Sequence, residues 1–236
     1  MIKKDLPDNM LAQIRGRLVV SCQALEDEPL HSPFIMSRMA LAAQQGGAAG
    51  IRASSVADVQ AIQQCVGLPV IALIKRSYAD SEVYITPTLK EVTELMALRP
   101  AMIVLDATLR PRPAGETLSG LVAAIRAGWP DVLLMADIAT LEEAQQAEAL
   151  GFDCIGTTLC GYTRQTAGMT LANGDYRLLR EMLATLNTPV IAEGHIDTPA
   201  IAARCLALGA WSVVVGGAIT RPQQITRRFV AALSGD

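Results

Sequence analysis

Residues 132–158 read VLLMADIATLEEAQQAEALGFDCIGTT, the pattern of one strand–helix–strand unit. The stretch begins and ends with short apolar runs, which are typical of strands buried on both faces of a parallel sheet. Between them, Thr140 and Glu143 have the spacing of a capping box, which predicts that a helix begins there. Gly151 is the residue type that commonly follows the end of a helix. The stretch therefore predicts a parallel α/β fold built from such units.

The same pattern recurs along the chain. Residues 196–209 repeat the spacing of residues 138–151, with Thr198 and Pro199 at the expected helix start and Gly209 at its end. Eight apolar runs alternate with helical patterns, which predicts a single (β/α)8 TIM barrel with a short N-terminal helix. An open doubly wound sheet is the structural alternative, but no G-x-G-x-x-G motif follows the first run. The predicted strands are Arg17–Gln23, Ala48–Arg52, Val70–Lys75, Met102–Asp106, Val132–Asp137, Cys154–Thr158, Val190–Glu193 and Ser212–Gly216.

Composition and charge favour one globular domain over residues 1–236. This length is typical of a single barrel, and with 51% hydrophobic residues the chain can bury a large core. The formal net charge of -3 comes without a clustered basic stripe, which argues against a nucleic-acid partner. The sequence shows no N-terminal apolar signal segment and no apolar stretch of membrane-spanning length. We therefore expect a cytoplasmic protein with no membrane partner.

The cysteine and histidine content argues against a metal site. The five cysteines lack C-x-x-C spacing, and Cys22, Cys154 and Cys205 lie in apolar segments where a reduced thiol packs as a small hydrophobe. The two histidines, His31 and His195, form no H-E-x-x-H motif, so no dedicated transition-metal site is expected. We expect chemistry that uses neither a metal nor a cofactor.

Charged residues at the ends of predicted strands are the candidate catalytic groups. In a parallel barrel, the carboxyl ends of all strands meet at the rim where barrel enzymes carry their active sites. Lys75 ends a buried strand, where desolvation would make it a usable base or Schiff-base nucleophile. The alternative for Lys75 is a strand-end lysine that reaches solvent. Glu193 ends another strand, and its alternative is a structural ion pair with Arg52 or Lys75.

Other polar residues at strand ends indicate an oxygen-rich ligand such as a sugar. Asp106 and Asp137 end strands in the same way, and several charges in one barrel mouth are costly unless they serve a polar ligand. Gln23 and Arg52 would supply hydrogen-bond donors beside them, unless they only pair with neighbouring strand ends. His195 is expected in a loop near the ligand, or as a solvated or structural histidine.

A glycine motif near the C-terminus predicts an anion site. The run VVVGGAITRP at residues 213–222 leads from a predicted strand through Gly216 and Gly217 to a helix start. In barrels, the loops after strands seven and eight often bind phosphate, and Gly194 and Arg221 are placed to contribute. A tight turn at the corner of the barrel is the alternative.

Eight short motifs, taken in their order and spacing, carry a resemblance to a known family. They are VSCQAL at 20–25, EPLH at 28–31, GGAAGIRA at 46–53, IKR at 74–76, YITPT at 84–88, LDAT at 105–108, ADI at 136–138 and VGGAITRP at 215–222. Each motif is moderately specific, but together they resemble the bacterial N-acetylmannosamine-6-phosphate 2-epimerase family. The resemblance covers nearly the whole chain.

The resemblance implies a (β/α)8 barrel that converts N-acetylmannosamine 6-phosphate to N-acetylglucosamine 6-phosphate in sialic acid catabolism. It implies that Lys75 and Glu193 are an acid–base pair, with an amino-sugar phosphate held among Gln23, Arg52 and Asp137. Inversion at C2 needs a proton removed beside a carbonyl and a proton returned to the opposite face, which two such groups can do.

Two other functions fit the same residues. A Schiff-base aldolase or lyase would also use a lysine in the mouth of a barrel. A catalytically silent sugar-phosphate-binding protein would use Lys75 only to neutralise Glu193. The chain departs from the resemblance at His195, because arginine is the more usual residue after Glu-Gly. The apolar segment Phe229–Leu233 offers a surface for a second subunit, from which we expect a homodimer.

Overall fold

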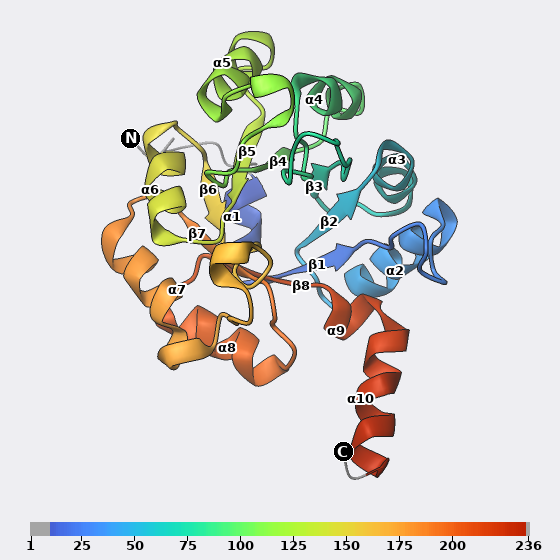
Figure 1. Ribbon diagram of the computed structural model, residues 1–236. Helices are drawn as coiled ribbons and strands as arrows, with labels where there is room; N and C mark the ends of the chain where they lie inside the picture. Colours follow the sequence, from blue (N-terminus) through green and yellow to red (C-terminus); the bar gives the residue numbers. More distant parts are fainter. Residues whose placement is uncertain (1–9, 235–236) are drawn as a thin grey trace.

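The computed structural model describes residues 10–234. Eight parallel strands pair in chain order, and β8 pairs with β1 to close the barrel, as the sequence predicts (Figure 1). The strands are short, apolar and almost entirely buried, as expected for a barrel wall covered by helices. They are β1 (Leu18–Cys22), β2 (Gly50–Ser54), β3 (Val70–Leu73), β4 (Met102–Asp106), β5 (Leu133–Asp137), β6 (Cys154–Gly156), β7 (Val190–Glu193) and β8 (Ser212–Val215).

Helices connect the strands and surround the barrel (Figure 1). After β8 come α9 (Gly217–Thr220) and α10 (Pro222–Ser234), and α10 extends away from the barrel. None of the helices between residues 10 and 234 combines the length and apolar character that crossing a bilayer requires. The others are α1 (Met10–Ile14), α2 (Pro33–Gln45), α3 (Val56–Cys65), α4 (Leu89–Met96), α5 (Leu118–Gly128), α6 (Leu141–Ala149), α7 (Asn173–Thr185) and α8 (Pro199–Leu208), with 3-10 helices η1 (Pro113–Gly115) and η2 (Arg164–Thr166).

The helix starts and ends predicted from the repeat are confirmed. The side chain of Thr140 accepts a hydrogen bond from Glu143 N–H, and the Glu143 carboxylate accepts one from Thr140 N–H, so α6 begins with a complete capping box. Thr198 caps α8 in the same position. Gly151 and Gly209 follow α6 and α8 with φ values of 81° and 113°, a left-handed conformation that glycine adopts without strain.

Strand side chains alternate between two apolar cores. Outward residues such as Ile51 and Leu105 pack against the helices. Inward residues such as Ile71 and Met135 fill the barrel together with Ile14 of α1, which closes the amino end. Because inward positions recur at every second residue, the next inward positions along each strand reach the mouth at the carboxyl end.

Strand β3 ends earlier than the sequence predicted. Its last residue is Leu73 rather than Lys75, because the following chain pairs with residues 84–86. Lys75 forms an antiparallel bridge with Ile85, and the carbonyl of Ile85 accepts a hydrogen bond of 2.9 Å from Asp106 N–H on β4. The returning segment thus takes the place beside β4 that a longer β3 would occupy. Lys75 keeps the inward parity of Leu73.

The remaining differences also lie at strand ends. β2 begins and ends two residues later than predicted, so Arg52 lies at its centre rather than at its end. β6 ends at Gly156, two residues before the predicted end. β1, β5 and β8 are shorter than predicted by one residue at one or both ends. The change in β2 matters for function, because it places the Arg52 side chain deeper in the barrel.

Candidate active site

Arg52 is the central charged residue of the barrel mouth. It is 2% exposed, and its guanidinium reaches from β2 to carboxylates at the ends of β5 and β7. Arg52 Nη2 donates to Asp137 Oδ2 at 2.5 Å, and Nη1 donates to Asp137 Oδ1 at 3.1 Å and to Glu193 Oε2 at 2.6 Å. The planar fork of the guanidinium suits this double contact. The ion pair between Glu193 and Arg52, one alternative from the sequence, is therefore present.

Glu193 is held in place by its backbone and lies in an environment that favours protonation. Its N–H donates to Thr157 Oγ1 at 3.0 Å, and Thr157 Oγ1 donates to the Glu193 carbonyl at 2.7 Å. Burial raises the pKa of Glu193 to about 7; the Asp137 charge acts in the same direction, and Arg52 opposes both. A carboxyl group with this pKa can accept and release a proton near neutrality.

Lys75 lies at the same mouth and is shifted in the opposite direction. Desolvation lowers its pKa to about 8, and the positive charges of Arg52 and Arg221 act in the same direction. The residue is nevertheless exposed at the open side of the mouth, so the desolvation comes from the protein that surrounds the rest of the side chain. Both alternatives that the sequence offered for Lys75 are therefore partly correct, because the side chain reaches solvent and is also partly desolvated.

A cavity of about 430 Å³ brings most of the predicted residues together. This volume suits a single small polar ligand. Asp137 is absent from the cavity wall; it is fully buried beneath Arg52, and Thr158 Oγ1 donates to it at 2.7 Å. Asp106 is also fully buried, and it pairs with Arg110 at 2.7 Å. The predicted residues that line the cavity are Gln23, Arg52, Lys75, Glu193, Gly194, Gly216, Gly217 and Arg221, together with His195.

Three buried polar atoms of cavity-lining residues lack hydrogen-bond partners within residues 10–234. They are Gln23 Oε1, Arg52 Nε and His195 Nε2. Gln23 is fixed from its other end, because its Nε2 donates to Ser21 Oγ at 2.9 Å. A buried polar atom without a partner costs free energy, so these atoms favour a ligand with hydroxyl or carbonyl groups.

The glycines of the mouth bring backbone close to the cavity. Gly194 has a φ of 95°, and a Cβ there would lie 3.2 Å from the carbonyl oxygen of Thr158. A Cβ on Gly217 would lie 2.2 Å from Oε1 of Gln224. A side chain at Gly194 would be strained by the positive φ, and one at Gly217 would require the Gln224 side chain to move, which supports the prediction that backbone groups approach a ligand here.

Arg221, the predicted anion-binding cation, already has a carboxylate partner. Its Nε donates to Glu28 Oε1 at 2.6 Å, and its Nη2 donates to Glu28 Oε2 at 2.9 Å. Glu28 also lines the cavity. The sequence singled out Arg221 from its glycine motif but gave no reason to pair it with a residue 193 positions away.

The sequence reasoning missed several further polar residues of the cavity wall, among them Ser21, Tyr84 and Tyr162. Ser21 has the inward parity of β1, a signal that could have identified it. Burial and the Asp137 charge raise the pKa of Tyr84 to about 12, so its phenol stays protonated and can donate a hydrogen bond. Tyr162 stacks on His195, with ring centroids 4.6 Å apart.

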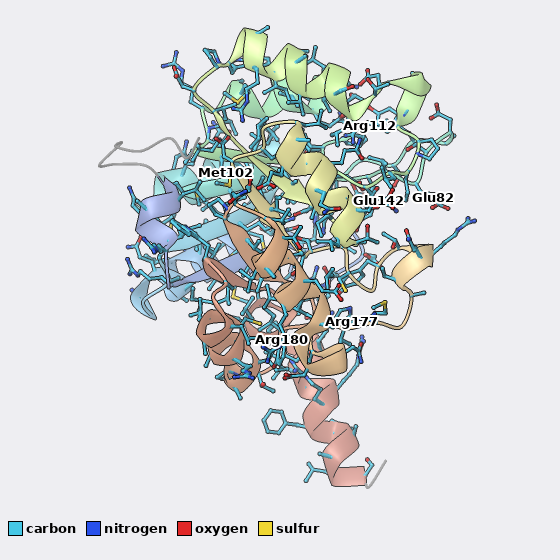
Figure 2. All side chains as sticks on the ribbon, turned by 90° about the vertical axis from the view of Figure 1, so that its left-hand side faces the viewer. Glu82, Met102, Arg112, Glu142, Arg177 and Arg180 are labelled. Carbon is cyan, nitrogen blue, oxygen red and sulfur yellow. The ribbon has the colours of Figure 1, made fainter. Side chains whose placement is uncertain are left out.

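The loops after β3 and β6 meet on the mouth side of the barrel. Arg164 Nη2 in the β6–α7 loop lies 2.6 Å from Glu82 Oε1 in the β3–α4 loop. Figure 2 shows Glu82 on the side of the molecule opposite α1, whereas Met102, at the amino end of β4, lies on the side of α1. Loops therefore border the mouth at one end of the barrel, and α1 closes the opposite end.

Comparison with known proteins gives consistent matches over nearly the whole chain. The sequence model of a family described as "Putative N-acetylmannosamine-6-phosphate epimerase" matches residues 36–235. A relative from Enterobacter sp. (strain 638), named "Putative N-acetylmannosamine-6-phosphate 2-epimerase", is 66% identical over 95% of both chains. A relative of the same name from Shouchella clausii is 58% identical over 95% of this chain and 98% of its own.

Solved structures agree with these matches. The N-acetylmannosamine-6-phosphate 2-epimerase from Clostridium perfringens superimposes with a TM-score of 0.91 and 54% identity, over 98% of this chain and 99% of its own. A thiamine phosphate pyrophosphorylase from Pyrococcus furiosus matches with a TM-score of 0.58 and 19% identity, over 90% and 88% of the two chains. The second likeness concerns the fold alone.

Replacing Arg52 with methionine should destabilise the protein more at pH 8 than at pH 5. The change leaves Asp137 and Glu193 buried without their cation, and breaking a buried ion pair typically costs about 3–5 kcal/mol. The unpaired carboxyls then have higher pKa values folded than unfolded, so the variant gains stability as the pH falls and they bind protons. Urea unfolding at the two pH values measures this.

Arg164→Met, which removes the exposed partner of Glu82, is the matched control and should change stability little at either pH. An equal loss at pH 5 and pH 8 in Arg52→Met would contradict the assignment of Arg52 as the counter-ion of both carboxylates.

Proposed function

We propose an activity for this chain, which belongs to the N-acetylmannosamine-6-phosphate epimerase family. The chain converts N-acetylmannosamine 6-phosphate to N-acetylglucosamine 6-phosphate in sialic acid catabolism. The observation that carries the proposal is that Lys75 and Glu193 line the same cavity. Their pKa values, about 8 and about 7, are shifted toward each other from ordinary values that lie far apart.

The chemistry of the reaction matches this pair. Opening of the sugar ring exposes an aldehyde at C1, which acidifies the hydrogen on C2. Lys75 takes this proton from the mannosamine epimer, and Glu193 returns a proton to the opposite face of C2; in the reverse direction the roles are exchanged. The intermediate is an enolate, and the step transfers no electrons to a carrier.

The neighbouring residues bind and orient the open-chain sugar. Arg52 stabilises the negative charge that develops on O1, since its unpartnered Nε–H donor lies at the cavity. Gln23 contacts a sugar hydroxyl, which donates a hydrogen bond to its unpartnered Oε1. Asp137 acts from beneath by fixing the Arg52 fork. Tyr84, as a protonated phenol, supplies a further donor.

The phosphate binds where the glycines of the mouth and Arg221 line the cavity. Backbone N–H groups at Gly194, Gly216 and Gly217 approach it without interference from side chains, and Arg221 supplies positive charge. Binding energy at this remote group positions C2 between the two acid–base residues. The substrate is a dianion that does not cross a bilayer unaided, which supports a cytoplasmic location.

The C-terminal helix supports the further proposal of a homodimer. No residue of α10 is buried, and Phe229, Val230 and Leu233 are 69%, 55% and 88% exposed. Exposed apolar side chains of this size on one helix are typical of a contact surface. We infer that α10 packs on a second copy of the chain.

The dimer proposal predicts a particle of twice the chain mass in light scattering. Phe229→Ser combined with Leu233→Ser should give a monomer, because the change removes apolar area from the contact. The exposed Leu109, which lies on the barrel, provides the control variant Leu109→Ser. A wild-type monomer at micromolar concentration would refute the dimer and leave the epimerase proposal intact.

The rate should depend on pH as a bell-shaped curve. One proton must be shared between Lys75 and Glu193, and below about pH 7 both groups are protonated. Above about pH 8 both are deprotonated. kcat/KM, measured from pH 5 to pH 10, should therefore fall on both sides of a narrow maximum. A rate that stays constant across this range would contradict the assigned pair.

Isotope exchange distinguishes two bases from one. In deuterated water, the product should carry deuterium at C2, which NMR detects directly. Lys75→Ala should abolish exchange and turnover from the mannosamine epimer, because loss of a positioned acid–base group costs at least about 10²–10⁴-fold. Glu193→Gln should lose interconversion to a similar extent and still exchange the C2 hydrogen of that epimer.

Retention of nearly all substrate hydrogen in the product would refute the assignment, as would near-normal turnover by Lys75→Ala. Permanent modification of Lys75 by borohydride in the presence of substrate would favour an imine mechanism instead. Binding without any turnover would favour a silent binding protein.

A further inference from the structure

The Glu28–Arg221 ion pair lies inside the cavity wall, where the proposed function places the phosphate. The two side chains are 15% and 20% exposed, and both carboxylate oxygens of Glu28 accept hydrogen bonds from the arginine. The contact joins the loop after β1 to the segment between α9 and α10. A carboxylate beside a phosphate site opposes anion binding by charge, so its presence requires a physical reason.

The geometry of the pair leaves part of the arginine available. A guanidinium carries five N–H donors, and Glu28 occupies the edge formed by Nε and Nη2. Among the described residues, the guanidinium of Arg221 donates only these two hydrogen bonds, so three N–H donors remain, two of them on the edge formed by Nη1 and Nη2. An edge with two parallel N–H donors suits bidentate binding of a phosphate.

Glu28 is itself held from two other directions. Leu25 N–H donates to Glu28 Oε2 at 2.7 Å, and Gln223 Nε2 donates to Glu28 Oε1 at 3.0 Å. The hydrogen bond from Arg221 lowers the pKa of Glu28, so the group stays ionised at neutral pH. The carboxylate is therefore a fixed anchor against which a long, flexible arginine side chain is oriented.

We propose that Glu28 is a positioning residue for substrate binding: it holds Arg221 by one edge of the guanidinium so that the other edge receives the 6-phosphate. The inference rests on the proposed function and assigns a role to a residue of the β1–α2 loop. Fixing the arginine in advance removes the entropy that phosphate binding would otherwise cost.

Charge and positioning predict opposite results when Glu28 is neutralised. If Glu28 acted only as a negative charge beside the phosphate, Glu28→Gln would strengthen phosphate binding. If it orients Arg221, the same change weakens binding. The sign of the effect therefore separates the two roles.

The experiment measures inorganic phosphate binding by calorimetry and as competitive inhibition of epimerisation. Glu28→Gln and Glu28→Ala should each weaken phosphate binding about ten-fold and raise KM for N-acetylmannosamine 6-phosphate to a similar extent, with a smaller change in kcat. Asp27→Asn removes the neighbouring exposed charge and serves as the matched control, with phosphate affinity unchanged.

A double-mutant cycle with Arg221→Ala completes the test. Adding Glu28→Ala to Arg221→Ala should cost no further phosphate affinity, because Glu28 acts through the arginine. Unchanged or tighter phosphate binding in both Glu28 variants would overturn the inference, as would losses that add fully in the double variant. A wild-type protein that binds phosphate but does not epimerise the sugar would instead refute the proposed function, while the calorimetric comparison still tests Glu28.

Discussion

The structure of the mouth depends on one buried cation shared by two carboxylates. Arg52 is almost wholly removed from water, and it holds Asp137 and Glu193 on strands across the barrel. Burying three charges is costly unless their geometry is good and their hydrogen bonds are satisfied. The bidentate contact with Asp137 supplies good geometry, and it leaves Nη1 to contact Glu193 and Nε without a protein partner at the cavity.

The same interaction explains how one pocket holds an acid and a base with similar pKa values. Arg52 repels the positive charge of Lys75 and, with desolvation, favours its neutral form. Asp137 partly cancels the effect of Arg52 on Glu193, so burial prevails and the carboxyl tends to hold its proton. The opposing shifts make proton exchange with C2 feasible near neutrality. Removing Arg52, Asp137 or Glu193 therefore changes the pKa values of the groups that remain.

The sequence predicted the barrel and its main charged residues for a physical reason: parity along buried strands is a local property. Lys75 and Glu193 could be recognised because charges at inward positions of apolar runs are rare. Positions set by distant contacts could not be read in this way. Glu28 meets Arg221 only after the barrel closes, and β3 ends at Leu73 only because residues 84–86 return beside it. Asp137, expected at the ligand, lies beneath Arg52 because β2 runs further than the sequence suggested.

The central claim, that this buried network poises Glu193 for proton transfer, can be tested by infrared titration of its carboxyl group. The difference spectrum between wild type and Glu193→Gln isolates the C=O stretch of the protonated acid. A band that disappears with a pKa near 7 is the result that the account predicts. A transition at the ordinary glutamate value of about 4.3 would contradict it.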